Sequence, residues 1–123
     1  MLRHAFSRLS RSRLACRIVF GVRAAPLEPG EHLFDATTLA LRRACRREVP
    51  QGTRVLELGT GSAAVLALWL WRRGCRVECT EIDGRIARRA RDNVRRNGAP
   101  LTVRETPLFE GLAGEAYDVV VFN

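Results

Sequence analysis

The sequence predicts an α/β domain whose strands form a doubly wound parallel sheet. From residue 54 onward, short segments rich in β-branched and other apolar residues alternate with longer segments of helical period. Strands separated by helices of this length are joined by right-handed crossovers, which place them parallel to one another. The last strand-like segment is apolar on both of its faces, as in a sheet that is covered on both sides. The predicted strands are 54–58, 75–80, 101–105 and 117–122, and the crossover helices are 62–73 and 84–96.

A helix is predicted ahead of the first strand. The segment 26–34 contains two prolines and a glycine and forms a turn-rich joint. Asp35 is a candidate N-cap for the helix that follows, and Pro50 ends it. Leu39 and Cys45 lie on one side of this helix, so its arginines are expected to face water.

Glycines punctuate the first strand–helix–strand unit. The strand 54–58 ends at Gly59, and the apolar helix 62–73 ends before Gly74. The helix 84–96 has an apolar side that is expected to face inward and consists of Ile86, Ala87, Ala90 and Val94. These elements form a contiguous unit without repeats or low-complexity segments.

The predicted spatial order of the strands is third, second, first, fourth. This order leaves residues 119–122 as an apolar edge on which the backbone groups of another chain could pair. We therefore expect the 123-residue chain to associate with itself, although its oligomeric state is not predicted.

The charge is uneven along the chain. All 21 basic residues are arginines, and they exceed the 13 acids by a net charge of +8. Residues 1–27 carry six arginines and no acid, whereas the rest of the chain carries 15 arginines and 13 acids. We therefore divide the chain into a basic N-terminal tail, 1–25, and a domain, 26–123. The tail has three interpretations: a solvated leader, an arm that contacts RNA or the ribosome, or a mitochondrial targeting segment.

Composition excludes several classes of protein. A content of 46% hydrophobic and 28% charged residues is that of an ordinary globular chain. The longest apolar run has nine residues, 63–71, about half of what a membrane span needs. The four scattered cysteines indicate reduced thiols and a cytoplasmic protein, with a mitochondrial location as the alternative. Cys75 and Cys79 are expected in the core, and no metal site is predicted.

The strongest chemical signal is the glycine pair after the first strand. Gly59 and Gly61 allow a tight turn and the close approach of a ligand to the next helix. Glu81 follows Gly61 by twenty residues at the end of the next strand, where an acid can accept hydrogen bonds from ribose hydroxyls. With Ala64 in the third glycine position, the loop also matches a dinucleotide fingerprint, so NAD is one candidate cofactor. Glu57 instead favours a ligand with a cationic amino-acid end, such as S-adenosylmethionine.

These motifs resemble those of class I S-adenosylmethionine-dependent methyltransferases, which have a Rossmann-like fold. The resemblance begins at Glu57–Ser62, continues through 80–83 and 87–94, and ends with 117–123. The final stretch is similar to the strand that leads into Asn-Pro-Pro-Tyr in amino-group methyltransferases. Among these, the HemK type, which methylates a glutamine amide in peptide release factors, is the most similar. The resemblance covers roughly residues 18–123 and implies the N-terminal half of such a domain.

The resemblance implies roles for individual residues. Gly59 and Gly61 would line the methionine end of the cofactor, Glu57 would support their loop, and Glu81 would bind the ribose. Thr60 and Ile82 complete the cofactor-binding set. Asn123 would be catalytic, because an amide can both donate to and accept from a planar acceptor group and so orient its nitrogen.

Departures from the family pattern limit these expectations. Ala63 and Thr106-Pro107 stand where the family often has a glycine and an adenine-reading acid. The chain reaches Asn123 without the Pro-Pro-Tyr that would complete the substrate site. We therefore expect a fragment that is inactive on its own.

The sequence thus predicts an S-adenosylmethionine-dependent N-methyltransferase that acts on a planar nitrogen. The preferred acceptor is the side-chain amide of a glutamine in a protein such as a translation release factor. One alternative is the methylation of an RNA base amino group. Another is a non-catalytic cofactor-binding fragment.

Overall fold

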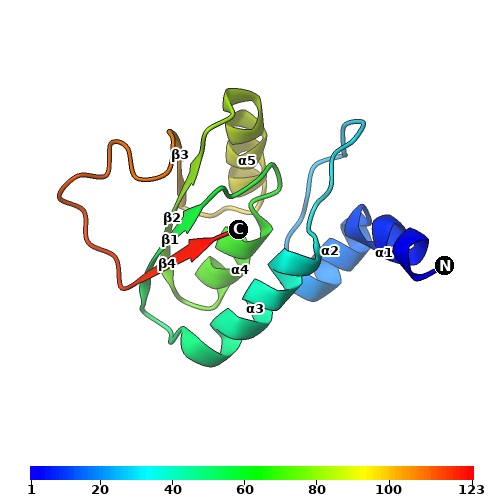
Figure 1. The fold of residues 1–123 in the computed structure, drawn as a ribbon, viewed down its shortest axis with the longest axis horizontal. Helices are drawn as coiled ribbons and strands as arrows, with labels where there is room; N and C mark the ends of the chain where they lie inside the picture. The colour runs from blue at the N-terminus through cyan, green and yellow to red at the C-terminus, as the bar shows by residue number, and fades with distance from the viewer.

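A four-stranded, fully parallel sheet forms the centre of the structure, a computed structural model that describes residues 1–123 (Figure 1). Its spatial order is β3-β2-β1-β4, which confirms both the predicted α/β fold class and the predicted strand order. The strands are β1 (Arg54–Leu58), β2 (Arg76–Glu81), β3 (Thr102–Glu105) and β4 (Val119–Phe122).

Five helices accompany the sheet. They are α1 (Leu2–Ser10), α2 (Arg13–Phe20), α3 (Ala36–Glu48), α4 (Val65–Arg72) and α5 (Gly84–Arg96). The crossover helices α4 and α5 pack on the sheet, and α2 and α3 pack on α4. The main core lies between these helices and one face of the sheet, where Val55, Val77 and Cys79 point. None of the five helices combines the length and the apolar character that crossing a membrane would require.

Local sequence signals set the ends of the helices. Asp35 caps α3 as predicted: its Oδ1 accepts a hydrogen bond from the backbone N–H of Thr38 at 2.8 Å. Asp83 caps α5 by accepting from the N–H groups of Arg85 and Ile86. Helix α4 begins three residues later than predicted, because Ala64 adopts a left-handed conformation with φ of 49° and interrupts the helical backbone.

The interpretation of residues 1–25 as a solvated tail outside the domain is wrong. These residues form α1 and α2, and Cys16, Phe20 and Val22 belong to the main core with at most 1% of their surface exposed. The arginines of α2 occupy its exposed side, whereas its apolar side packs on α4. The buried residues of this side, Ala15, Cys16 and Phe20, recur at helical spacing, but the arginines dominate the composition of the segment.

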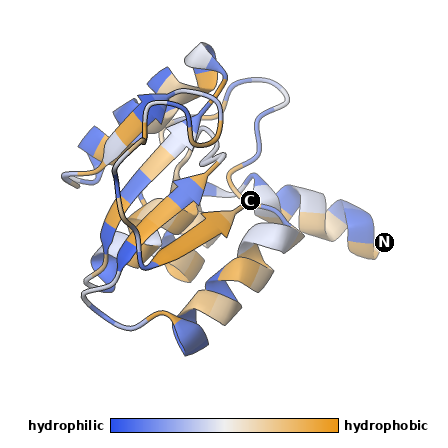
Figure 2. Cartoon of the chain, turned by 60° about the vertical axis from the view of Figure 1, so that its left-hand side comes forward, coloured by the Kyte–Doolittle hydropathy of each residue, from blue (hydrophilic) through white to orange (hydrophobic).

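The second face of the sheet carries a much smaller core. Leu56 and Leu58 contact Leu112 from the long segment between β3 and β4. Along β4, Val120 and Phe122 are 49% and 66% exposed, and Figure 2 shows this strand as an apolar ribbon at the edge of the sheet. The predicted apolar edge is therefore confirmed, while self-association through it stays a prediction.

All four cysteines are buried and carry free thiols. Cys79 lies in β2 and Cys75 directly precedes it, both within the core as predicted. Burial raises the pKa of Cys16 and of Cys79 to about 12, so both thiols stay protonated at neutral pH. Protonated buried thiols are chemically inert, and these residues act as small apolar side chains.

Candidate functional site

The loop between β1 and α4 makes the tight turn that its two glycines predict. Gly59 and Gly61 both have φ of 73°, a left-handed conformation that favours glycine. A Cβ on Gly59 would lie 3.2 Å from the backbone oxygen of Asn123, so the end of β4 closes against this loop. A Cβ on Gly61 would meet no atom within 4 Å, so the space above this residue is open.

A cleft joins this loop to the end of β4 and to the segment that precedes α3. It is lined by the predicted site residues Gly59, Thr60, Gly61 and Asn123, and by residues 32–35, Thr38, 62–63 and Val65. The side-chain amide of Asn123 donates to the hydroxyl oxygen of Thr38 at 3.3 Å. The carboxyl ends of parallel strands meet at one edge, which explains why residues more than sixty positions apart converge here.

Glu81 ends β2 at the same edge, next to the glycine loop. Its Oε1 accepts a hydrogen bond from the N–H of Gly61 at 3.2 Å, and its Oε2 accepts from the N–H of Asp83 at 3.3 Å. Only 9% of Glu81 is exposed, whereas its neighbour Ile82 is 68% exposed. The carboxylate therefore connects the glycine loop with the loop after β2, and Ile82 projects into solvent beside it.

Glu57 lies beneath the glycine loop and is fully buried. The hydroxyl of Thr60 donates to its Oε1 at 2.6 Å, and its Oε2 has no partner. The pKa of this carboxyl is raised to about 8, chiefly by burial and also by the charge of nearby Glu81, while hydrogen bonds from Thr60 and from the backbone of Ala67 oppose the shift. The supporting role expected for Glu57 fits this position, because the side chain fixes Thr60 without reaching the surface.

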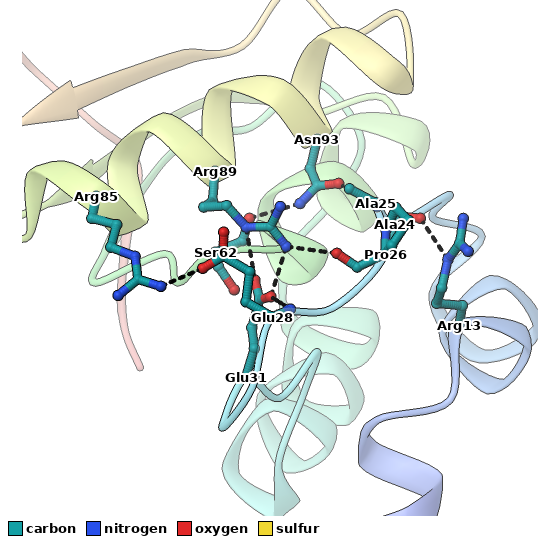
Figure 3. Close-up of polar contacts among 10 residues, drawn as sticks. All are labelled: Arg13, Ala24, Ala25, Pro26, Glu28, Glu31, Ser62, Arg85, Arg89 and Asn93. Carbon is teal, nitrogen blue, oxygen red and sulfur yellow. Dashed lines mark hydrogen bonds and ion pairs between the residues drawn. The ribbon is translucent and has the colours of Figure 1, made fainter.

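A polar network holds the segment 26–34 over the N-terminal part of α5 (Figure 3). Arg89 forms two hydrogen bonds with Glu31, at 2.6 and 3.2 Å, and a third with the carbonyl of Pro26 at 2.9 Å. Arg85 binds Glu28 at 2.5 Å. Burial alone would raise the pKa of Glu31, but the hydrogen bond and charge of Arg89, helped by bonds from Glu28 and Ser62, lower it below the ordinary value.

Asn93 ties the same segment to the glycine loop region. Its Oδ1 accepts from the N–H of Ala25 at 2.8 Å, and its Nδ2 donates to the carbonyl of Ser62 at 2.8 Å (Figure 3). The side chain is 1% exposed. Asn93 therefore fixes the distance between the segment that borders the cleft and the start of α4.

Sequence reasoning missed several residues of the site. Thr38 and His32 line the cleft, and Asn93 and Arg89 position its borders. Two signals could have found them. The Asp35-x-x-Thr38 capping box follows a Pro-Gly turn, and an amide at position 93 lies on the apolar side of α5.

No protein-family model matches the chain. A ribosomal protein L11 methyltransferase from Caldicellulosiruptor bescii is 34% identical over 104 residues, which are 79% of this chain and 33% of that protein. The chain thus spans about a third of the length of this curated relative. A second L11 methyltransferase, from Shouchella clausii, is 32% identical over 90 residues.

Solved structures of methyltransferases superpose on this fold. A methyltransferase from Pyrococcus furiosus superposes with a TM-score of 0.78 at 22% identity, covering 98% of this chain and 60% of its own. The T. thermophilus 16S rRNA N2 G1207 methyltransferase, in complex with AdoMet and guanosine, superposes with a TM-score of 0.68 at 27% identity. The superposition covers 79% of this chain and 27% of that protein. The chain therefore has the Rossmann-like fold of class I S-adenosylmethionine-dependent methyltransferases.

Proposed function

We propose that this chain binds S-adenosylmethionine in the cleft between the glycine loop and β4, and that Asn123 presents a planar acceptor nitrogen to it. One observation carries the proposal: the glycine loop, Glu81 and Asn123 meet at the carboxyl edge of β1, β2 and β4. The named relatives are methyltransferases, and one solved neighbour holds the cofactor.

The residues present fit this cofactor. The open space above Gly61 leaves room for a ligand against the backbone, and Glu81 stands beside it with a carboxylate that ribose hydroxyls can reach. The unpartnered Oε2 of Glu57 adds an acidic group behind the loop. With a pKa raised to about 8, this carboxyl is mostly protonated at neutral pH, so it acts on the loop through its hydrogen bond with Thr60 and not through its charge.

The chemistry asks mainly for positioning. S-adenosylmethionine supplies the methyl group from its sulfonium. Asn123 accepts a hydrogen bond from the acceptor NH2 through Oδ1, and so aims the nitrogen lone pair along the line of attack. The nitrogen–carbon bond forms as the carbon–sulfur bond breaks, and the surplus proton leaves to solvent. Thr38 holds the amide of Asn123 in place through its hydroxyl oxygen.

Replacing Glu81 with alanine should weaken cofactor binding about tenfold, the effect of losing hydrogen bonds to a charged group. Isothermal titration calorimetry with S-adenosylhomocysteine measures this on the chain as it stands. Glu48→Ala, which removes an exposed acid at the end of α3, is the matched control and should bind like the wild type. The proposed cofactor site is contradicted if the chain binds NADH but not S-adenosylhomocysteine. It is also contradicted if Glu81→Ala and Glu48→Ala bind S-adenosylhomocysteine with equal affinity.

For the acceptor, we propose a glutamine amide of a protein, with an RNA base amino group as the second candidate. The L11 methyltransferase relatives support a protein substrate, whereas the rRNA methyltransferase with bound guanosine supports the second candidate. The HemK-type specificity remains part of the proposal.

Nuclear magnetic resonance separates these acceptors without requiring turnover. In the presence of S-adenosylhomocysteine, N-acetylglutamine amide should shift the side-chain NH2 signal of Asn123, which Asn123→Asp identifies by its loss. Guanosine or adenosine should leave that signal in place. If only the nucleosides shift this signal, the RNA base amino group and not the glutamine amide is the acceptor. If none of these compounds shifts it, the chain is a non-catalytic cofactor-binding module.

A further inference from the structure

A second groove lies on the helical side of the domain, apart from the cofactor cleft. We call it the arginine groove, and it is lined by Arg13, Leu14, Arg17, Arg23, Ala24 and Arg96. Its residues come from α2, from the segment after α2 and from the last turn of α5. It includes no acidic residue, so its electrostatic potential is positive along its length.

The four arginines of the groove are free to bind an anion. All four are exposed, and none forms an ion pair with a carboxylate. One bond is formed by Arg13, whose Nε donates to the carbonyl of Ala24 at 3.0 Å and leaves its terminal nitrogens available. Asp92, an acid on the neighbouring face of α5, pairs with Arg95 instead.

The groove is rigidly built, although its walls are distant in sequence. The side chain of Asn97 accepts from the N–H of Arg23 at 2.8 Å and donates to its carbonyl at 2.9 Å. These two bonds hold the segment after α2 beside the end of α5, and thereby place Arg23 next to Arg96. Because Asn93 fixes Ala25 to the same helix, the arrangement is set before any ligand arrives.

From this arrangement we infer that the arginine groove binds the phosphodiester backbone of a single-stranded nucleic acid. Guanidinium groups bind phosphate oxygens through two parallel hydrogen bonds, and the groove presents four of them along one concave surface. Leu14, which is 68% exposed at the groove, offers an apolar surface that unpaired bases could contact. A concave site suits a flexible strand better than a flat membrane surface. This inference goes beyond the proposed function and does not depend on it.

Fluorescence anisotropy with fluorescein-labelled oligo(U) and oligo(dT) of about 12 nucleotides tests the inference on the whole chain. The variant Arg17→Glu/Arg96→Glu should bind at least tenfold more weakly than the wild type. The control Arg43→Glu/Arg88→Glu has the same charge change at exposed positions outside the groove, and should lose about twofold. Arg17→Gln/Arg96→Gln, which adds no acid, should give an intermediate loss.

The dependence on salt gives a second readout. Four phosphate contacts on a single strand predict a slope of log affinity against log salt of about −2.8, which the groove variant should reduce by about half. Equal binding of both oligonucleotides indicates that the backbone alone is recognised, and tighter binding of oligo(U) indicates RNA. Equal losses in the groove and control variants, or an unchanged slope, would overturn the inference. Stronger binding to phosphatidylserine vesicles than to either oligonucleotide would also overturn it.

Discussion

Replacing Asn93 with leucine is expected to lower the free energy of unfolding by about 3 kcal/mol, because it leaves the buried N–H of Ala25 and the partly buried carbonyl of Ser62 without their partner. Asn93 is the hydrogen-bond partner of the Ala25 N–H and of the Ser62 carbonyl, each at 2.8 Å. Leucine has the same branched shape at Cγ, although it is larger, and it can neither donate nor accept. The cost of an unmade buried hydrogen bond is about 1 to 3 kcal/mol for each group, so the two losses together exceed the effect of an ordinary surface substitution.

Urea unfolding followed by circular dichroism measures this loss. Asn97→Leu is the matched control, because it makes the same chemical change four residues later, at the partly exposed C-cap of α5. Its partner, Arg23, can bind water in place of the lost amide, so the control should lose less than about 1 kcal/mol. Equal losses in the two variants would show that Asn93 contributes no more than a surface amide.

The parallel sheet was predictable because its signals are local and repeat along the chain. Each strand is a short apolar segment that ends where a helical period begins, and the crossover rule converts that alternation into the order β3-β2-β1-β4. The helix α2 was not predicted, because arginines dominate the composition of residues 1–25, although most residues of α2 are apolar. Its place in the core depends on packing against α4, which lies about fifty residues later in the sequence.

Some residues of the candidate site were predictable from local sequence signals, and others were not. Gly59, Gly61 and Glu81 were found because a turn and a strand end require these residue types at fixed spacing. Thr38 and Arg89 were missed, because their roles arise from the path of the segment 26–34, which no periodic pattern describes. The pairing of Arg89 with Glu31 joins residues 58 positions apart and exists only in the folded chain.

The protonation of Glu57 should make the stability of the domain depend on pH. The folded protein raises the pKa of this carboxyl from 4.5 to about 8, chiefly by burial. The folded state therefore binds the proton more tightly than the unfolded state does. The stability that this proton confers is fully present below about pH 4.5 and is lost as the pH rises through about 8.

Replacing Glu57 with glutamine removes this titration while it keeps the size of the side chain. Between pH 5 and pH 8, the free energy of unfolding of the wild type should fall relative to Glu57→Gln by an amount on the order of 3 kcal/mol, since each unit of pKa shift is worth about 1.4 kcal/mol. Urea unfolding at a series of pH values measures the difference, and comparison with the variant cancels the titration of the other carboxylates. Glu48→Gln, an exposed control, should stay parallel to the wild type at every pH. Parallel curves for Glu57→Gln as well would mean that the buried carboxyl keeps an ordinary pKa, and that the glycine loop rests on a charged group throughout this range.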